Sequence, residues 1–283
     1  MVSVLHEPII AVICSCLHMR EIRGVAFDKK LIVENILKTI YRYITIMNNP
    51  ILISLEGNIG AGKSTLLEHL ERHYRKNESV VFLREPVHLW EHIRDESGNT
   101  MLSKFYADPK QYAFPFQIMA YTTRLHELKR VVRENPKCKV IICERSLEAD
   151  KHIFAKMLHD DGLIDSVMYQ IYEKYFAEYE GQFRINGLIY VRALPEVCFD
   201  RVCMRSREGE NKIHVDYLKK CHDYHERWLQ TTPIQCHTLD VNANVCFEKL
   251  DETSLMHVWV NEVSTFLDTL KKEHTQPTTH VFA

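Results

Sequence analysis

Residues 55 to 66 read LEGNIGAGKSTL, a stretch in which three glycines and a lysine stand between an apolar run and an amphipathic run. The pattern G-x-x-x-x-G-K-[ST] is satisfied from Gly57 to Ser64. Ile51 to Leu55 before it is typical of a buried strand, and Thr65 to Tyr74 after it is typical of a helix. A strand, a glycine-rich loop and a helix in this order predict a loop that holds the phosphates of a nucleoside triphosphate.

Such a loop binds phosphate through several groups. Its backbone N–H groups and the N-terminus of the following helix carry partial positive charge, and the glycines let an anion approach closely. Lys63 would reach the β- and γ-phosphates of the nucleotide, and Ser64 would ligate Mg²⁺. A glycine-rich turn with a surface lysine is the alternative, and the flanking strand and helix disfavour it. The residues predicted to bind the nucleoside triphosphate, which the family resemblance described below identifies as ATP, are Gly57, Asn58, Ile59, Gly60, Ala61, Gly62, Lys63, Ser64 and Thr65.

The composition limits the class of partner. The 283 residues are 46% hydrophobic and 26% charged, which suffices for the core of one fairly large domain. The 36 basic and 38 acidic residues nearly cancel, which argues against a protein that binds nucleic acid through its phosphates. We therefore expect small-molecule ligands, with neither nucleic acid nor a membrane as partner.

Cysteine usage indicates the compartment. Nine cysteines are scattered along the chain without C-x-x-C spacing, and several fall in apolar runs, so we expect reduced thiols in the cytoplasm. The spacing of Cys221, His222 and His225 would suit part of a zinc site, but a fourth ligand is not evident. We interpret these histidines, and Trp228, as structural helix residues.

The first 47 residues lack the patterns of the rest of the chain. Pro8 to Leu17 is apolar but too short to span a bilayer, and Glu7 precedes it where a secretory signal carries basic residues. Acidic residues also interrupt a mitochondrial address, which remains an alternative. We expect residues 1–47 to be an extension of unknown role, absent if translation starts at Met47, and residues 48–283 to form one domain.

Apolar runs alternate with helical patterns after residue 48. Strands separated by helices predict a parallel sheet with helices on both faces. Ligands of such sheets lie beyond the carboxyl ends of the strands. The predicted strands are Ile51–Leu55, Val80–Leu83, Val140–Cys143, Gly187–Val191 and a weaker run at His237–Val241.

Charged residues follow two of these strands. Glu85 comes directly after the second strand, and Glu144, Arg145 and Asp150 follow the third. Each alone would fit a solvated surface charge. Because parallel strands end at one edge of the sheet, these residues would meet Lys63 there, and Glu85 would stand where a hydroxyl nucleophile needs a base.

A helical pattern between the second and third strands carries polar residues on one face. Gln117, Ala120 and Arg124 are spaced i, i+3 and i+7, so they share this face. A glutamine amide suits the hydrogen-bonding edge of a nucleobase, and Phe116 or Phe154 could stack on its ring. A surface glutamine beside a core stripe is the alternative.

Three arginines near the end of a later helix form an R-x3-R-x-R series. Arg201, Arg205 and Arg207 would be unremarkable on a solvated helix. As a lid they would close over the phosphates, neutralise the transferred group and exclude water, a competing acceptor.

The motifs together resemble a known family. GNIGAGKST, EPVxxW, PFQ, ERS, IYVRALPE, the arginine series and YLKKCHDYHERWL occur in the order found in the deoxynucleoside kinases of the deoxycytidine and deoxyguanosine kinase group, over residues 50 to 268. The resemblance implies a five-stranded α/β phosphate-loop kinase fold, transfer of the γ-phosphate of ATP to the 5′-hydroxyl of a deoxynucleoside, and a homodimer. It makes residues 48–283 the kinase domain, and a deoxynucleoside triphosphate is a candidate feedback inhibitor.

The resemblance also implies residue roles. Glu85 matches the base for the 5′-hydroxyl, and Arg145 and Lys63 match the cations at the reacting end. Glu144 and Ser64 match the Mg²⁺ ligands. The other matches are Tyr106 and Glu210 at the 3′-hydroxyl, Gln117, Phe116 and Phe154 at the base, Val87 and Trp90 along the pocket, and Arg201, Arg205 and Arg207 in the lid.

Substrate preference depends on one pair of residues. Members of the family that prefer deoxycytidine and purine deoxynucleosides carry residues like Arg124 and Asp150 beside a small residue like Ala120, whereas thymidine-accepting members tend to lack the pair. We therefore expect deoxycytidine, deoxyadenosine or deoxyguanosine to be favoured. Phe105 stands where relatives commonly carry methionine, and residues 242–247 lack an acidic pattern found in some relatives, which leaves the choice of donor open.

Three alternatives differ in substrate. A broad-specificity or thymidine-preferring kinase would keep all the motifs. A nucleoside monophosphate kinase would need a further basic site for the acceptor's phosphate. A GTP-binding switch would need a guanine-reading N-K-x-D stretch, which the sequence lacks.

Overall fold

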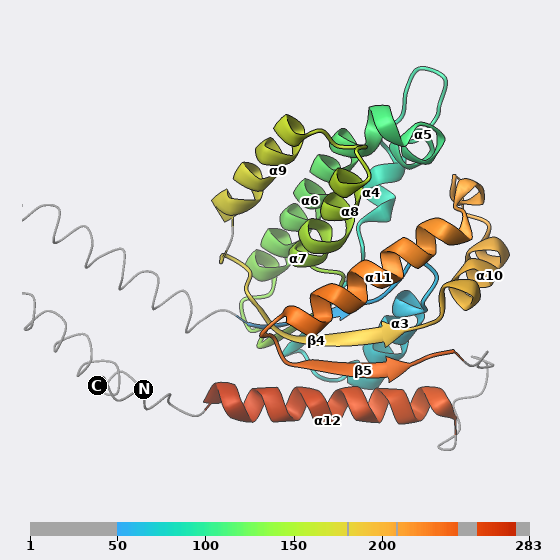
Figure 1. Cartoon of the computed structure of the whole chain (residues 1–283). Coiled ribbons are helices and arrows are strands. Elements are labelled where there is room, and N and C mark those ends of the chain that lie inside the picture. The colour runs from blue at the N-terminus through green and yellow to red at the C-terminus, as the bar shows by residue number, and fades with distance from the viewer. Residues whose placement is uncertain (1–49, 180, 208, 243–253, 276–283) are drawn as a thin grey trace, which may run out of the picture. The chain divides into compact units, whose positions relative to one another are not determined.

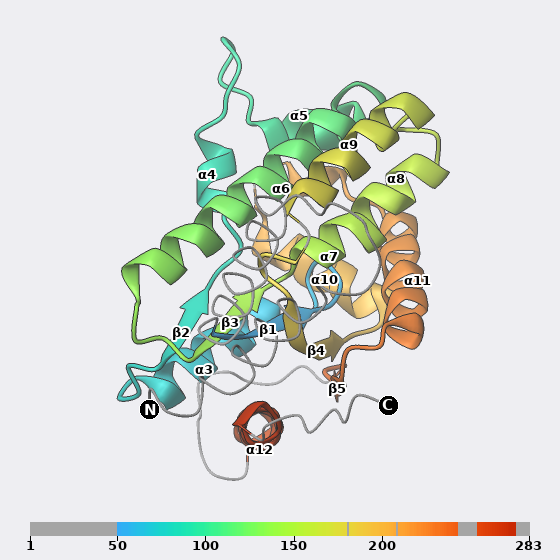
Figure 2. The same cartoon turned by 90° about the vertical axis from the view of Figure 1, so that its left-hand side faces the viewer.

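Five strands form one parallel sheet in the order β2-β3-β1-β4-β5. Figure 1 shows β4 and β5 side by side and pointing the same way, and Figure 2 shows all five strands. This confirms the α/β phosphate-loop kinase fold with a five-stranded sheet. The computed structural model describes residues 50–179, 181–207, 209–242 and 254–275, so the predicted extension 1–47 and residues 243–247 lie outside the described residues. The strands are β1 (Ile51–Glu56), β2 (Val80–Leu83), β3 (Val140–Glu144), β4 (Ile185–Arg192) and β5 (Cys236–Asp240).

Three strands, β1, β3 and β4, extend further than their apolar runs, whereas β2 matches its run and β5 begins and ends one residue earlier than predicted. β1 and β3 each include a terminal glutamate, and Leu55 pairs with Glu144 in the ladder. β4 begins at Ile185, two residues before Gly187. Gly187 lies inside this strand, where a Cβ atom would be 2.5 Å from Leu270 Cδ1, so the missing side chain lets the C-terminal helix approach the sheet.

Helices cover both faces of the sheet. α3 (Lys63–Tyr74) and α12 (Leu255–Thr275) pack on the face to which Ile53 and Leu55 point. α6 (Pro109–Glu134), α9 (Ser166–Tyr179) and α11 (Val215–Thr231) contribute to the core on the face of Leu52. Successive residues of a strand point to opposite faces, which produces these two cores. Figure 2 shows α12 below the strands and α6, α8 and α9 above them.

A third core lies beyond the carboxyl ends of the strands. Trp90, Leu102, Phe105 and Phe116 bury their rings or methyl groups there. Thr100 and Asp108 start two of its helices, because each side chain accepts a backbone N–H of the first turn. The remaining segments are α4 (Val87–Glu91), α5 (Met101–Ala107), α7 (Leu147–Ala149), the π-helical turn η2 (Asp150–Ala155), α8 (Lys156–Asp160), α10 (Pro195–Arg205) and the short turn η3 (Glu210–Lys212).

The cysteines of the described residues are all free. Cys143, Cys198 and Cys221 are buried, as predicted, whereas Cys203 and Cys236 are exposed. His225 is buried in α11, with Nδ1 2.6 Å from the backbone oxygen of Cys221 and its ring stacked on Tyr190, as expected of a structural histidine. Within the described ranges, no helix combines the length and apolar character needed to cross a bilayer.

Candidate active site

A cavity of about 870 Å³ lies at the carboxyl ends of the strands. Two predicted residues do not line it. Gly57 approaches the backbone of Val191, where a Cβ would lie 2.4 Å from the carbonyl oxygen, and the buried Asn58 amide donates to the Leu218 carbonyl at 2.8 Å. All the other predicted site residues line it: Ile59, Gly60, Ala61, Gly62, Lys63, Ser64, Thr65, Glu85, Val87, Trp90, Tyr106, Phe116, Gln117, Ala120, Arg124, Glu144, Arg145, Asp150, Phe154, Arg201, Arg205, Arg207 and Glu210.

The phosphate loop folds around its own lysine. Lys63 Nζ donates to the backbone oxygens of Gly57 at 3.2 Å and Asn58 at 2.8 Å. Burial, with the positive charge of Arg145 adding to it, lowers the pKa of Lys63 to about 8. Lys63 is thus still largely protonated at neutral pH. It lines the cavity as the first residue of α3, and the N-terminus of a helix favours anions.

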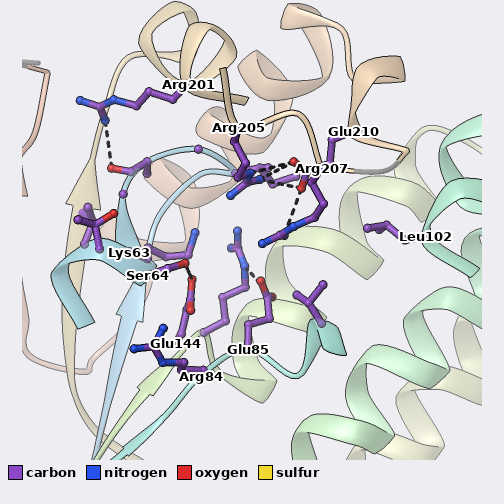
Figure 3. Close-up of a pocket in the computed structure, with 18 of the residues that line it drawn as sticks. Lys63, Ser64, Arg84, Glu85, Leu102, Glu144, Arg201, Arg205, Arg207 and Glu210 are labelled. Atoms are coloured by element: carbon purple, nitrogen blue, oxygen red, sulfur yellow. Dashed lines mark hydrogen bonds and ion pairs between the residues drawn. The ribbon is translucent and has the colours of Figure 1, made fainter. Parts of the chain in front are cut away.

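Two hard oxygen ligands meet beside the lysine. The Ser64 hydroxyl donates to Glu144 Oε1 at 2.6 Å, and Figure 3 shows this contact next to Lys63. Mg²⁺ prefers oxygen ligands, and it commonly takes one or two from the protein and the rest from phosphates and water. The donor set of Ser64 and Glu144 therefore fits this ion.

Glu85 lies between two arginines. Its Oε1 accepts from Arg124 Nη2 at 3.1 Å and lies 3.2 Å from Arg145 Nε. Burial alone would raise the pKa of Glu85, but the positive charges of Arg145 and Arg124 outweigh it and lower the pKa to about 2. Glu85 is therefore ionised at neutral pH, and its charge contributes to the pKa of Lys63 across the cavity.

The predicted pair of Arg124 and Asp150 is formed, and both side chains are buried. Arg124 Nε donates to Asp150 Oδ2 at 2.9 Å, and Nη1 donates to the Glu144 backbone oxygen at 2.9 Å. Burial opposes the charge on Arg124, but Asp150 and Glu85 outweigh it and raise its pKa. The third contact of this guanidinium, to Glu85, was not predicted from the sequence.

Arg145 has an unusual backbone. Its φ is 64°, in the left-handed region, which costs a residue with a side chain about 1–3 kcal/mol. The guanidinium lies over the Phe154 ring at 4.7 Å, and Nη1 is buried with no hydrogen-bond partner among the described residues. Phe154 and Asp150 both come from the π-helical turn η2, a structure that often marks functional sites.

The far end of the cavity is aromatic. Phe116 stacks on Phe105 with ring centroids 4.6 Å apart, and Trp90 meets Phe116 edge to face at 5.6 Å. Gln117 is buried on the same helix, and its Oε1 has no partner among the described residues. An unpaired buried amide beside flat apolar walls suits a nucleobase edge.

The arginine series is held in two places. Arg205 and Arg207 both donate to Glu210, at 2.7 Å and 3.3 Å, as Figure 3 shows. Arg201 donates to the backbone oxygens of Ala61 at 3.2 Å and Val241 at 2.8 Å. Burial and the nearby charge of Glu210 raise the pKa of Tyr106, so this hydroxyl faces the cavity in its neutral form.

Several lining residues were not singled out from the sequence. Met256 and Trp259 come from α12, far along the chain from the phosphate loop, and no residue of this helix was singled out from the sequence. Phe105 was noted only as a departure from relatives, and its stacking on Phe116 came from the structure. The other unanticipated lining residues are Leu66, Arg84, Leu102, Val191, Met204, Tyr217 and Val241.

The fold and the cavity define a phosphate-loop phosphotransferase whose cavity extends from the phosphate loop to an aromatic end that suits an acceptor. A sequence model of the deoxynucleoside kinase family matches residues 53–266. The chain therefore belongs to the deoxynucleoside kinase family. It is a kinase that transfers a phosphoryl group from ATP to the 5′-hydroxyl of a deoxynucleoside.

Curated relatives match over most of the chain. A probable deoxycytidine kinase of fowlpox virus is 32% identical over 248 residues, which cover 86% of this chain and 98% of that protein. Deoxycytidine kinase 1 of Xenopus laevis is 33% identical over 252 residues, covering 77% of this chain and 91% of that protein. The mitochondrial deoxyguanosine kinase of the same species is 32% identical over 195 residues, covering 62% and 72%.

Proposed function

We propose that this kinase favours deoxycytidine and purine deoxynucleosides over thymidine and supplies deoxynucleoside monophosphates for nucleotide salvage. One observation carries the preference. Arg124 and Asp150 form a buried pair beside Ala120, so the base meets a fixed guanidinium and carboxylate in place of an apolar space for a methyl group. Relatives named as deoxycytidine and deoxyguanosine kinases support the same choice.

Glu85 is the base in this mechanism. Its carboxylate is ionised and accepts the proton of the 5′-hydroxyl as the oxygen attacks the γ-phosphorus. A pKa of about 2 makes it a weak base in the empty site, which suffices where proton transfer is late in a loose transition state. Gln117 binds the edge of the base, Phe116 and Phe154 flank its ring, and Val87 and Trp90 bound the pocket.

The phosphate end supplies positive charge. Lys63, Arg145 and the three lid arginines line the same cavity. Ser64 and Glu144 would hold Mg²⁺, which supplies charge neutralisation on the β- and γ-phosphates when bound. Positioning and charge neutralisation account for most catalysis of phosphoryl transfer, and the protein contributes both here.

The sugar binds next to the lid. Tyr106 and Glu210 line the cavity there and contact the 3′-hydroxyl. Because Glu210 also accepts from Arg205 and Arg207, the carboxylate that holds the sugar also positions two lid cations. The cavity is continuous from Gln117 to Lys63, so a deoxynucleoside triphosphate would fit as a feedback inhibitor that occupies both ends.

The protein acts as a cytoplasmic homodimer in this proposal, with residues 48–283 as the kinase domain. Support for the dimer comes from the first two turns of α9, where Val167, Met168 and Ile171 are 64%, 40% and 52% exposed. Sedimentation velocity of Ile171→Glu tests it against Ile93→Glu, a control on another exposed apolar residue. Loss of the dimer in the first variant alone is expected, and a dimeric Ile171→Glu would contradict it.

The activity is tested by incubating the protein with ATP and each of the four deoxynucleosides, then with the monophosphates. We expect monophosphates to form, with the largest kcat/KM for deoxycytidine or a purine deoxynucleoside. Equal or greater kcat/KM for thymidine would replace this preference with the broad-specificity alternative. Product from monophosphates alone would indicate a nucleoside monophosphate kinase.

A further inference from the structure

Glu56 is a buried carboxylate that the mechanism above does not use. It is the last residue of β1, directly before Gly57, and is 0% exposed. Its Oε1 accepts hydrogen bonds from the hydroxyls of Ser54 at 2.6 Å and Ser146 at 2.5 Å. Its Oε2 is buried and has no hydrogen-bond partner among the described residues. Burying a carboxyl group with an unpaired oxygen is costly, so its presence at this place calls for a physical reason.

Ser146 connects Glu56 to the reacting end of the site. Its hydroxyl donates to Glu56 and accepts the backbone N–H of Ala149 at 3.0 Å, which starts α7. Both hydrogen-bonding directions of the hydroxyl are therefore used inside the protein. Ser146 directly follows Arg145, so this side chain fixes the backbone on the C-terminal side of the arginine.

Arg145 is fixed on its N-terminal side as well. Its own N–H donates to the Leu55 carbonyl at 3.0 Å, so two neighbouring residues of β1, Leu55 and Glu56, hold both ends of the turn. The arginine between these attachments has a φ of 64°. A non-glycine residue keeps this conformation only where its surroundings enforce it, and such residues gather at active sites.

We propose that Glu56 is a positioning residue for phosphoryl transfer, because its bond to Ser146 holds Arg145 in the left-handed conformation that directs the guanidinium to Glu85. This inference rests on the proposed role of Arg145. In this conformation Arg145 Nε lies 3.2 Å from Glu85 Oε1, and Nη1 keeps a donor that the described residues do not satisfy. A relaxed turn would move both groups, and small displacements of a charge-bearing donor lower kcat steeply.

Ser54 offers a matched control. Ser54→Ala and Ser146→Ala each remove one buried hydroxyl that donates to the same oxygen of Glu56. Only Ser146 belongs to the turn of Arg145. We expect Ser146→Ala to lower kcat by at least about 10-fold, with the KM values for ATP and deoxycytidine within about 3-fold, and Ser54→Ala to keep kcat within about 3-fold. Equal losses of kcat in the two variants would overturn the proposal.

Glu56→Ala separates the effect of the Ser146–Glu56 hydrogen bond from the effect of the helix cap that Ser146 provides. Ser146→Ala also removes the cap of α7, whereas Glu56→Ala leaves Ser146 in place to accept from Ala149. A loss of kcat that Ser146→Ala and Glu56→Ala share therefore measures the contribution of the Ser146–Glu56 hydrogen bond. Glu56→Gln keeps an oxygen that can accept from Ser146, so we expect it to recover most of the kcat lost in Glu56→Ala. A Glu56→Gln variant as slow as Glu56→Ala would count against the hydrogen bond.

A double-mutant cycle with Arg145→Met gives the most specific readout, because a merely structural role of Ser146 would act independently of the arginine. We expect Ser146→Ala to lower kcat by less than about 2-fold once Arg145 is replaced, and multiplicative losses would overturn the proposal. An Arg145→Met enzyme with normal kcat would remove Arg145 from the mechanism and the inference with it. A low kcat in Arg145→Met together with a normal kcat in Ser146→Ala would overturn the role of Glu56 and Ser146, and it would leave the role of Arg145 in the mechanism intact.

Discussion

Arg124 Nη2 donates to Glu85 Oε1 over 3.1 Å, so the guanidinium that pairs with Asp150 also touches the proposed catalytic base. In the proposed mechanism, substrate selection and proton transfer therefore share one side chain. Arg145 contacts the same oxygen of Glu85. The Glu85 carboxylate therefore keeps its contact with Arg145 when Arg124 is replaced. Replacing the Arg124–Asp150 pair should for this reason change specificity more than it changes the base.

The first prediction concerns thymidine. Arg124→Met with Asp150→Ala removes the charged pair and opens space beside Ala120, so kcat/KM should shift toward thymidine relative to deoxycytidine by about 10-fold or more, as expected for loss of a buried polar contact. Steady-state kinetics with the two substrates measures the ratio. An unchanged ratio would show that the base is recognised elsewhere.

The same pair makes a prediction about stability. Arg124→Met alone leaves Asp150 buried without its cation, which should lower the free energy of unfolding by about 3–5 kcal/mol. Adding Asp150→Ala removes the uncompensated charge and should recover part of this loss. Urea denaturation of the two variants compares them. If the double variant is less stable than Arg124→Met, the pair is not coupled as the structure indicates.

The lowered pKa of Lys63 predicts how kcat/KM for ATP depends on pH. Its pKa of about 8 means that the empty enzyme loses this positive charge as pH rises through 8, so kcat/KM for ATP should fall, approaching 10-fold per pH unit. At saturating ATP the phosphates raise the lysine pKa, and the fall in kcat should lie at higher pH. Deoxycytidine is the suitable acceptor for this measurement, because its base has no acidic N–H whose ionisation would add to the pH profile. An alkaline fall at the same pH in both profiles would assign it to another group.

Two glycines of the phosphate loop offer a matched test of close packing. Gly60 and Gly62 both have positive φ, so alanine is strained at either position. A Cβ at Gly60 would lie 2.4 Å from the Cys198 oxygen of α10, whereas one at Gly62 meets nothing within 4 Å. Because α10 carries Arg201 and Arg205, Gly60→Ala should raise the KM for ATP at least about 10-fold more than Gly62→Ala does. Similar effects of both would show that backbone strain alone matters.

Local patterns predicted most of the fold. Apolar runs of four or five residues between helical patterns were enough to place all five strands, because a parallel sheet covered on both faces needs such runs. The ends of the strands were less predictable. Glu56 and Glu144 continue β1 and β3 although their side chains are polar, since backbone pairing does not depend on the side chain and serine hydroxyls donate hydrogen bonds to both carboxyl groups.

The site was predictable where residues follow strand ends or share a helix face. Glu85, Arg145 and Gln117 all line the cavity for these reasons. Contacts between distant segments had no such signal. Arg124 contacts Glu85, and Trp259 of α12 lines the cavity. Both arrangements arise from tertiary packing of segments far apart in the chain, and no residue spacing in the sequence indicates them. The left-handed Arg145 was also missed, because arginine has no preference for that region.

Steady-state measurement of kcat and KM for Glu85→Gln tests the central claim most directly. The amide keeps the size of the side chain but cannot accept the proton of the 5′-hydroxyl, so kcat should fall at least about 100-fold while the KM for the deoxynucleoside changes little. Glu91→Gln, an exposed residue six positions further along the same segment, should behave like the unmodified enzyme. A Glu85→Gln enzyme with near-normal kcat would show that the proton goes elsewhere and would contradict the mechanism.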